Sequence, residues 1–309
     1  MPTRGGAFRI FRLFGIDVYL HWAWFLIVAY DIQARNHVYS SYLWNGLETL
    51  SLFGIVLMHE FGHALACRSV GGTAKQIILW PLGGVAFVSP PQRPGAMLWS
   101  IAAGPLVNVA LTPLLIGLRL LGEFAGWENH FPDLFTYTVA VMWTNIVILI
   151  FNLLPIYPLD GGQIFRSLLW FVVGRANSLM VASALGFVGV AGMCVLAFLA
   201  KDTWFWILAA FAGLNCWNGY QQSQQLLRLE KAPRRQEFRC PVCAESPPIG
   251  NFWRCTQCGN GFDTFQTNAH CPNCNAEYSV TACPYCFNSR PMPEWMALQT
   301  PTNPPPPGA

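Results

Sequence analysis

The sequence predicts an all-α polytopic membrane protein with about six transmembrane helices, followed by a small cysteine-rich domain outside the membrane. Of its 309 residues, 53% are hydrophobic and only 11% are charged, whereas charged residues make up about 25% of an average soluble domain. Long stretches carry no charge, while the last third holds a basic segment and most of the cysteines. The chain therefore has two regions that fold in different solvents.

Six apolar windows are long enough, or nearly so, to span a bilayer. They cover roughly residues 18–32, 47–70, 95–121, 134–155, 178–200 and 203–220. With the amino terminus inside, 13 Lys and Arg residues fall on the cytoplasmic side, and only Arg35, Arg119 and Lys201 fall on the other. Because this distribution satisfies the positive-inside rule, we expect both termini to lie in the cytosol. We expect an integral membrane protein, of a bacterial cytoplasmic membrane.

The second window carries the motif HEFGH, in which His59, Glu60 and His63 lie where ionisable groups are expensive. A helix returns to the same face after four residues, so the two histidines can offer their imidazoles to one ion. Glu60 would project beside them towards a bound water, and zinc suits this set of ligands. The alternative is a pair of packed histidines bonded to the backbone. We favour a metal site because all three residues share one turn of a membrane helix.

A catalytic zinc ion needs three protein ligands and one open position, so a third ligand must come from elsewhere. The stretch NLLPIYPLDGG, residues 152–162, interrupts the fourth window with prolines and glycines, and Asp160 is its only acid. Irregular backbone at this depth requires other groups to satisfy it, as in a protein cavity. Asp160 and Gln163 also fit a capping box that opens a helix. The spacing leaves both roles open for Asp160.

Three motifs together resemble the site-2 proteases, which are intramembrane zinc metalloproteases. They are HEFGH in the second window, AGPLVN at residues 103–108, and NLLPIYPLDGG after the fourth window. The resemblance covers about residues 8–222 and assigns residues 1–222 to a membrane domain. It implies that His59, His63 and Asp160 bind a catalytic Zn²⁺ and that Glu60 is the general base that activates a zinc-bound water. The expected activity is hydrolysis of peptide bonds in or near transmembrane segments of membrane protein substrates.

The family resemblance also assigns a role to Asn152, which matches an asparagine that stabilises the oxyanion or positions the substrate. An amide that satisfies the broken helix is the alternative. Asn108, within the third window, is better explained as a polar link between helices than as a chemical group. His21 resembles a histidine often found in the family's first span, and we expect it to be packed and hydrogen-bonded.

Residues 75–88, KQIILWPLGGVAFV, are too short to span the membrane and predict two extended runs about a Gly83–Gly84 turn. This region resembles a short re-entrant β-hairpin of the family, whose edge can pair with an unwound substrate. Strand addition of this kind would expose peptide bonds that a helix hides. The alternative is a surface hairpin without a partner.

The carboxyl-terminal third divides into a polar linker at residues 223–239, a cysteine-rich domain at 240–290 and a disordered Pro-rich tail at 291–309. Each CxxC pair can place two sulfurs on one metal, and two pairs complete a tetrahedral site, so four pairs predict two structural zinc ions. Pairing in sequence, first with second and third with fourth, resembles a double zinc ribbon, and the spacing does not exclude a crossed pattern. The expected ligands are Cys240, Cys243, Cys255, Cys258, Cys271, Cys274, Cys283 and Cys286.

Composition also limits the partners. From residue 223 onward, seven basic and six acidic side chains differ by only +1, which disfavours nucleic acid. A cytosolic protein partner suits this region better, and the basic linker could contact anionic lipid headgroups. The membrane domain would meet the lipid bilayer and a transmembrane protein or peptide substrate. The main alternative function is a non-catalytic membrane scaffold that recruits a cytosolic partner through its tail. A metal transporter is a weaker alternative, because the windows carry no further chain of paired acids or histidines.

Overall fold

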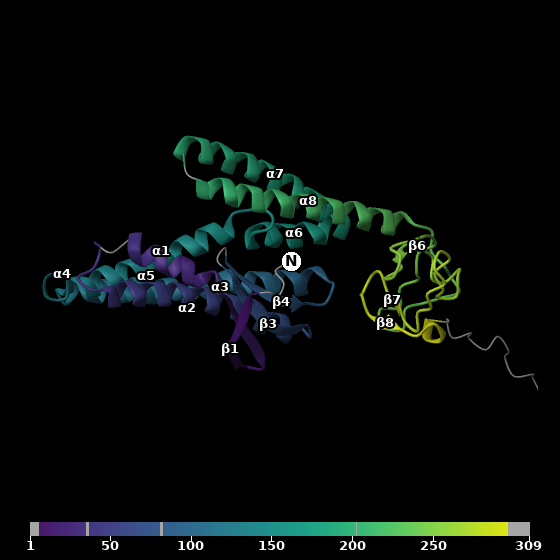
Figure 1. The fold of residues 1–309 in the computed structure, drawn as a ribbon, viewed down its shortest axis with the longest axis horizontal. Helices are drawn as coiled ribbons and strands as arrows, with labels where there is room; N and C mark the ends of the chain where they lie inside the picture. The colour runs from purple at the N-terminus through teal and green to yellow at the C-terminus, as the bar shows by residue number, and fades with distance from the viewer. Residues whose placement is uncertain (1–5, 35–36, 81–82, 202, 296–309) are drawn as a thin grey trace, which may run out of the picture. The chain divides into compact units, whose positions relative to one another are not determined.

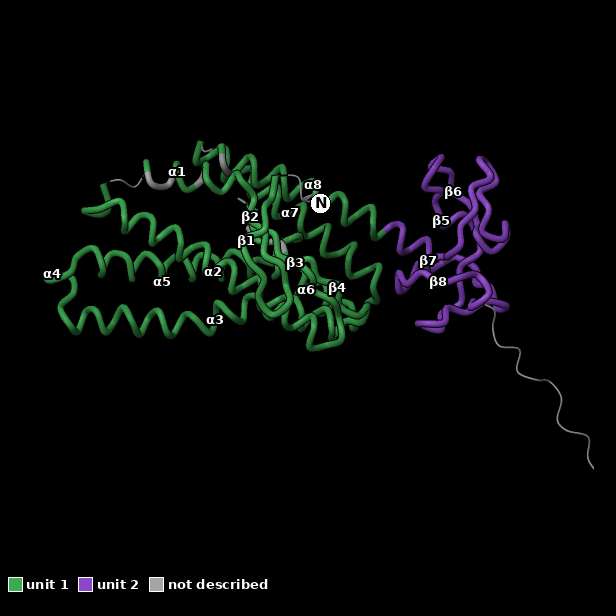
Figure 2. Tube along the Cα trace, turned by 60° about the horizontal axis from the view of Figure 1, so that its bottom comes forward, with its two compact units in different colours: residues 1–223 green, residues 224–309 purple. Residues whose placement is uncertain are grey.

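The computed structural model describes residues 6–34, 37–80, 83–201 and 203–295. The chain divides into two compact units, Met1–Ser223 and Gln224–Ala309 (Figure 2). The first unit contains β1 (Ala7–Leu13), β2 (Ile16–His21), α1 (Trp24–Ala34), α2 (Tyr42–Ser69), β3 (Thr73–Trp80), β4 (Gly83–Ser89), α3 (Pro94–Phe124), α4 (Trp127–His130), α5 (Pro132–Leu153), α6 (Asp160–Val173) and α7 (Arg175–Ala200) (Figure 1). Helix α8 (Thr203–Lys231) runs from the first unit into the second.

Four of the described helices, α2, α3, α5 and α7, are long and apolar enough to cross a membrane. This number is smaller than the six that the sequence predicts. The window at 18–32 is divided between β2 and α1, and α1 has only 11 residues, too few to span the hydrocarbon core. The window at 203–220 forms the first part of α8, where Asn215 and Asn218 lower the hydropathy.

A four-stranded sheet in the order β1-β2-β3-β4 crosses the first unit. β2 pairs in parallel with β3, and the other two pairings are antiparallel. Of these four strands, only β3 and β4 were predicted from the sequence. The sequence of β2 nevertheless alternates between apolar and polar residues, as a strand with one buried face does. Ile16 and Val18 are fully buried on one face, while Asp17, between them, pairs with Arg9 at 3.3 Å.

The glycine pair of the hairpin does not form its turn, contrary to the prediction. Gly83 and Gly84 lie in β4, opposite Trp80 and Leu79 of β3. The connection therefore falls at residues 81–82, which lie outside the described part of the chain. Gly84 is needed in the strand for a different reason, which is the close approach of Glu60.

The sheet fixes the rotation of α2. One buried cluster joins the two and contains Ile16, Val18, Trp24, Phe61, Ala64, Ala74, Ile77 and Leu79. At 100° per residue, Phe61 and Ala64 face the sheet, while His59 and His63 lie on a different side of the helix. There Gly62 brings α2 against α3, since a Cβ on Gly62 would lie 2.7 Å from the carbonyl oxygen of Ala103.

The second unit is a small domain with two short hairpins. They are formed by β5 (Trp253–Arg254) with β6 (Gly261–Phe262) and by β7 (Thr281–Ala282) with β8 (Ser289–Arg290). The indole nitrogen of Trp253 donates to the carbonyl oxygen of Ala282 at 2.9 Å and links the two hairpins.

The domain extends beyond its predicted boundaries, residues 240 and 290, at both ends. The amide of Ile249 donates to the carbonyl oxygen of Pro233, so part of the predicted linker pairs with the domain. At the other end, Met292–Trp295 form a 3₁₀ helix, and Trp295 is fully buried against Phe265. Residues 292–295, which were predicted to be part of a disordered tail, are therefore ordered, because Trp295 belongs to the core of the domain. Residues 296–309 lie outside the described part.

Candidate metal centre

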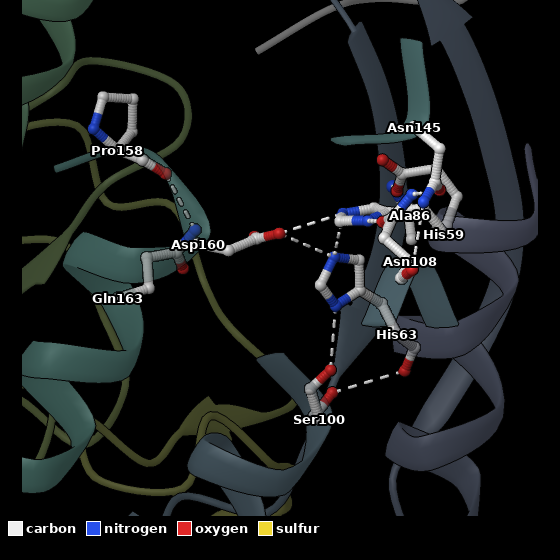
Figure 3. A network of polar contacts seen from close by, with 10 residues as sticks. His59, His63, Ala86, Ser100, Asn108, Asn145, Pro158, Asp160 and Gln163 are labelled. Carbon is white, nitrogen blue, oxygen red and sulfur yellow. Dashed lines mark hydrogen bonds and ion pairs between the residues drawn. The ribbon is translucent and has the colours of Figure 1, made fainter. Parts of the chain in front are cut away.

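Three polar side chains from two distant segments converge within the first unit. His59 and His63 lie one turn apart on α2, and Asp160 is the first residue of α6. The Oδ2 atom of Asp160 lies 2.9 Å from Nε2 of His59 and 3.2 Å from Nε2 of His63, and the two Nε2 atoms are 3.1 Å apart. Figure 3 shows Asp160 projecting towards both imidazoles. The structure therefore brings the three predicted ligands together.

The capping box that the sequence also allowed does not form. The residue that caps α6 is Leu159, and this helix start has no side-chain cap hydrogen bond. The Asp160 carboxylate is directed at the histidines instead. The Gln163 side chain donates to the carbonyl oxygen of Pro158 at 3.0 Å. The helix start thus aims Asp160 at the histidine pair.

The partners of the Nδ1 atoms fix which imidazole nitrogens carry hydrogen. Nδ1 of His63 lies 3.0 Å from the carbonyl oxygen of Ser100, which can only accept. Nδ1 of His59 lies 2.6 Å from Oδ1 of Asn108. Both Nδ1 atoms therefore donate, and both Nε2 atoms present lone pairs.

Two lone pairs and a carboxylate oxygen that converge within about 3 Å repel one another unless a cation lies between them. Two imidazole nitrogens and one carboxylate oxygen are also the three-ligand set of open catalytic zinc sites. The residues present therefore fit a zinc ion.

A family model described as peptidase family M50 matches residues 48–138 and 127–196. The matched residues include both histidines and Asp160. The match lies within the first unit. The resemblance to the site-2 proteases, found from three motifs, is thereby confirmed, and the four apolar helices agree with an integral membrane protein.

Curated relatives include a zinc metalloprotease of Methanocaldococcus jannaschii, 30% identical over 72% of this chain and 62% of the relative. Stage IV sporulation protein FB of Bacillus subtilis is 32% identical over 56% of this chain and 58% of the relative. The chain thus spans about three fifths of the length of these relatives. Among solved structures, the site-2 protease of Methanocaldococcus jannaschii is 24% identical, with a TM-score of 0.49, over 69% of this chain and 95% of that one.

Two glycines of the first unit make room for the polar cluster. A Cβ on Gly104 of α3, in the AGPLVN motif, would lie 2.3 Å from Nε2 of His63 and 2.8 Å from Nε2 of His59. A Cβ on Gly84 of β4 would lie 2.3 Å from Cγ of Glu60. Any larger residue at either position would push a functional side chain out of place.

We expect Gly104→Ala to weaken zinc binding at this site by about 10- to 100-fold, the range seen when the surroundings of metal ligands are disturbed. The added methyl group must displace an imidazole whose Nδ1 is already held from the other side. Chelator competition on the purified chain measures the change. Gly117→Ala is the matched control on the same helix, because a Cβ there meets nothing within 4 Å. Unchanged affinity in Gly104→Ala would contradict this account.

Glu60 is buried beside the histidine pair, with 6% of its surface exposed, and is turned towards the sheet. Its Oε2 accepts a hydrogen bond from the amide of Ala86 in β4 at 2.8 Å. Its Oε1 lies over Gly84, which has no side chain to cover it. One carboxylate oxygen of Glu60 is therefore held by a backbone amide, and the other lies beside backbone that no side chain covers.

The three other residues considered in the sequence, Asn152, His21 and Asn108, lie in different surroundings. Asn152, in the last turn of α5, is half-buried and takes no part in the contacts of the histidine–aspartate cluster described above. His21 stacks on Trp80 and accepts from the amide of Ala23, as expected for a packed histidine. Asn108 links helices, as predicted, and also contacts His59. Sequence reasoning missed Asn145, although an asparagine inside an apolar helix was a signal that could have identified it.

The eight tail cysteines form two clusters, but not in the order predicted. The first CxxC pair joins the fourth and the second joins the third, so the sequential pairing is wrong. The clusters are Cys240, Cys243, Cys283 and Cys286 (the outer cluster) and Cys255, Cys258, Cys271 and Cys274 (the inner cluster). Sulfurs of facing knuckles lie 3.5 to 3.7 Å apart. A tetrahedron with Zn–S bonds of about 2.3 Å has edges of about 3.8 Å, so both clusters fit zinc.

One member of the inner cluster has a side-chain donor of its own. The Tyr278 hydroxyl donates to Sγ of Cys255 at 3.0 Å and lowers the pKa of the Cys255 thiol to about 6. This shift favours the thiolate, which is the form that binds metal.

Proposed function

We propose that this chain is an intramembrane zinc metalloprotease that hydrolyses peptide bonds in or near transmembrane segments of membrane protein substrates. The observation that carries the proposal is the convergence of the His59, His63 and Asp160 donor atoms, with the buried carboxylate of Glu60 next to His59 on α2. The three donors would hold a Zn²⁺, which supplies a Lewis acid for the scissile carbonyl and for a water molecule. The match to peptidase family M50 supports the same activity.

Glu60 is the proposed general base. It takes a proton from the attacking water and later delivers it to the leaving amine. The amide of Ala86 holds Oε2 and so orients the carboxylate, while Oε1, over Gly84, is free to exchange the proton. Asn152 is proposed as a further catalytic residue that contacts the substrate near the scissile bond, since it precedes Asp160 by eight residues on the segment that enters the site.

Strand β4 is the proposed binding site for the substrate backbone. It is the last strand of the described sheet, and Ala86 and Gly84 place it against Glu60. A substrate segment that unwinds and pairs with this edge would present its peptide bonds in extended form beside the base. We place this unit in a bacterial cytoplasmic membrane, with both termini in the cytosol.

A non-catalytic scaffold is the competing function, since the two cysteine clusters could serve recruitment of a cytosolic protein alone. Metal analysis of the full-length chain separates the two possibilities. We expect three zinc ions per wild-type chain, two in the tail and one in the membrane unit, and two in His59→Ala. A wild-type chain that already holds only two, with no change in His59→Ala, would favour the scaffold. His21→Ala is the control, because His21 lies outside the cluster.

A further inference from the structure

A pair of fully buried asparagines lies behind His59. Asn108 on α3 and Asn145 on α5 are both 0% exposed. The Nδ2 atom of Asn108 donates to Oδ1 of Asn145 at 2.8 Å. The Nδ2 atom of Asn145 donates to the carbonyl oxygen of Asn108 at 3.1 Å and to Oγ1 of Thr112 at 3.0 Å. Figure 3 shows the pair on the far side of the imidazoles from Asp160.

Only one assignment of donors and acceptors satisfies this network. The hydroxyl of Thr112 gives its hydrogen to the carbonyl oxygen of Asn108 at 2.8 Å, so towards Asn145 it can only accept. Asn145 must therefore turn its NH₂ group towards Thr112 and its oxygen towards Asn108. Asn108 in turn must give its NH₂ group to Asn145, and its oxygen is left facing Nδ1 of His59.

An asparagine amide can present either oxygen or NH₂ to a neighbour, and this choice decides which imidazole nitrogen of His59 carries hydrogen. If Asn108 were reversed, its NH₂ would face Nδ1. Hydrogen would then move to Nε2, where it would point at Nε2 of His63 and at Asp160. His59 could not ligate a metal in that form.

We propose that Asn145 is a positioning residue for the metal centre: it holds the Asn108 amide in the one orientation that leaves the Nε2 lone pair of His59 free for zinc. This inference rests on the proposed function, because it assumes that His59 is a zinc ligand. It also ties the position of α5 to metal affinity, although α5 supplies no ligand of its own.

A purely structural role predicts a different result. If the asparagines only link α3 to α5, their replacement lowers stability and leaves metal affinity and the His59 tautomer as they were. A role in orientation makes a further prediction about Asn108→Asp. A carboxylate offers oxygen in either orientation, so His59 keeps its hydrogen on Nδ1 whether or not Asn145 is present.

The test uses the full-length chain in detergent, with Zn²⁺ as the probe, and measures the affinity of the membrane-unit site by chelator competition. We expect Asn145→Ala to weaken zinc binding by about 10- to 100-fold, the range typical of residues that orient metal ligands. In the Asn108→Asp background, the same replacement should change the affinity by less than about twofold. Thr138→Val is the control, because Thr138 is a buried polar residue on the same helix as Asn145, and its hydroxyl donates to the carbonyl oxygen of Phe135 outside the asparagine network.

Nitrogen NMR of histidine in the zinc-free chain provides a second readout. We expect one tautomer of His59 in wild type, with hydrogen on Nδ1, and a mixture in Asn145→Ala. If Asn145→Ala does not fold, Asn145→Leu serves instead, because an apolar residue of similar volume favours insertion of α5.

Three outcomes would overturn the proposal. Unchanged zinc affinity in Asn145→Ala, with lower thermal stability, would leave only a structural link between helices. If Asn145→Ala lowered the zinc affinity equally in the wild-type and the Asn108→Asp backgrounds, control through the Asn108 amide would be excluded. A wild-type chain with no zinc beyond the two tail ions would overturn the proposed function together with this inference, and so that failure is distinct from the first two.

Discussion

Replacing Glu60 by glutamine is expected to lower the rate of peptide-bond cleavage by about 10²- to 10⁴-fold, the usual contribution of a general base. Glutamine has nearly the same size and keeps an oxygen for the amide hydrogen of Ala86. It therefore preserves the packing against Gly84 and loses only the ability to take a proton. Zinc content should not change, because neither imidazole nor Asp160 is altered.

The measurement is cleavage of a co-expressed single-span membrane protein, followed by the ratio of cut to uncut substrate. The chain offers a matched control in Glu48→Gln. Glu48 is also 6% exposed and lies on the same helix, where it accepts a hydrogen bond from Tyr39, and it is outside the histidine–aspartate cluster. Equal cleavage by wild type and Glu60→Gln would rule out the proposed mechanism, whereas a loss in both variants would indicate damage to α2.

Replacing Cys283 by serine is expected to unfold most of the tail domain within the full-length chain. Structural zinc supplies about 10 to 16 kcal/mol of folding free energy in zinc-finger peptides, and a domain of this size has little other core. Cys283 also packs in the cluster that contains Cys240, Phe265 and Trp295. Loss of the outer metal should therefore release Trp295 as well.

Hydrogen exchange of residues 240–295 measures this effect, and metal analysis should show at least one zinc ion fewer per chain. Cys194→Ser on α7 is the control, because Cys194 belongs to neither cluster. Slow exchange in Cys283→Ser, together with a lost zinc ion, would show that the tail holds its fold without the outer site. The peptide-bond cleavage assay on the same variant then shows whether the membrane unit depends on a folded tail.

The candidate site was predictable from the sequence where its geometry is local. His59 and His63 are four residues apart on a helix, and this spacing alone places them side by side. Asp160 is separated from His59 by 101 positions. Its role depended on the resemblance to a family, because its spacing from Gln163 fitted a helix cap equally well. Asn145 was missed because its role depends on a partner on another helix.

The fold was predictable to a lesser degree for a related physical reason. Hydropathy locates apolar windows, but it does not distinguish a crossing helix from a strand followed by a short helix, as at β2 and α1. The pairing of the CxxC motifs was not encoded in their spacing, since every knuckle has the same local geometry. Long-range packing decided both features. The close approach of Gly84 to Glu60 likewise emerged only when β4 was set against α2.

The nested arrangement of the tail cysteines has a consequence for the order of its assembly. The inner cluster closes a loop between Cys255 and Cys274, 19 positions apart, while the outer cluster joins Cys240 to Cys286, 46 positions apart. The shorter loop loses less chain entropy on closure, and once closed it removes 19 of the 46 positions from the longer one. During synthesis the inner knuckles emerge as one contiguous piece, whereas the outer knuckles stand at opposite ends of the domain. Metal binding at the outer cluster is therefore the last of the two steps in the assembly of the tail domain.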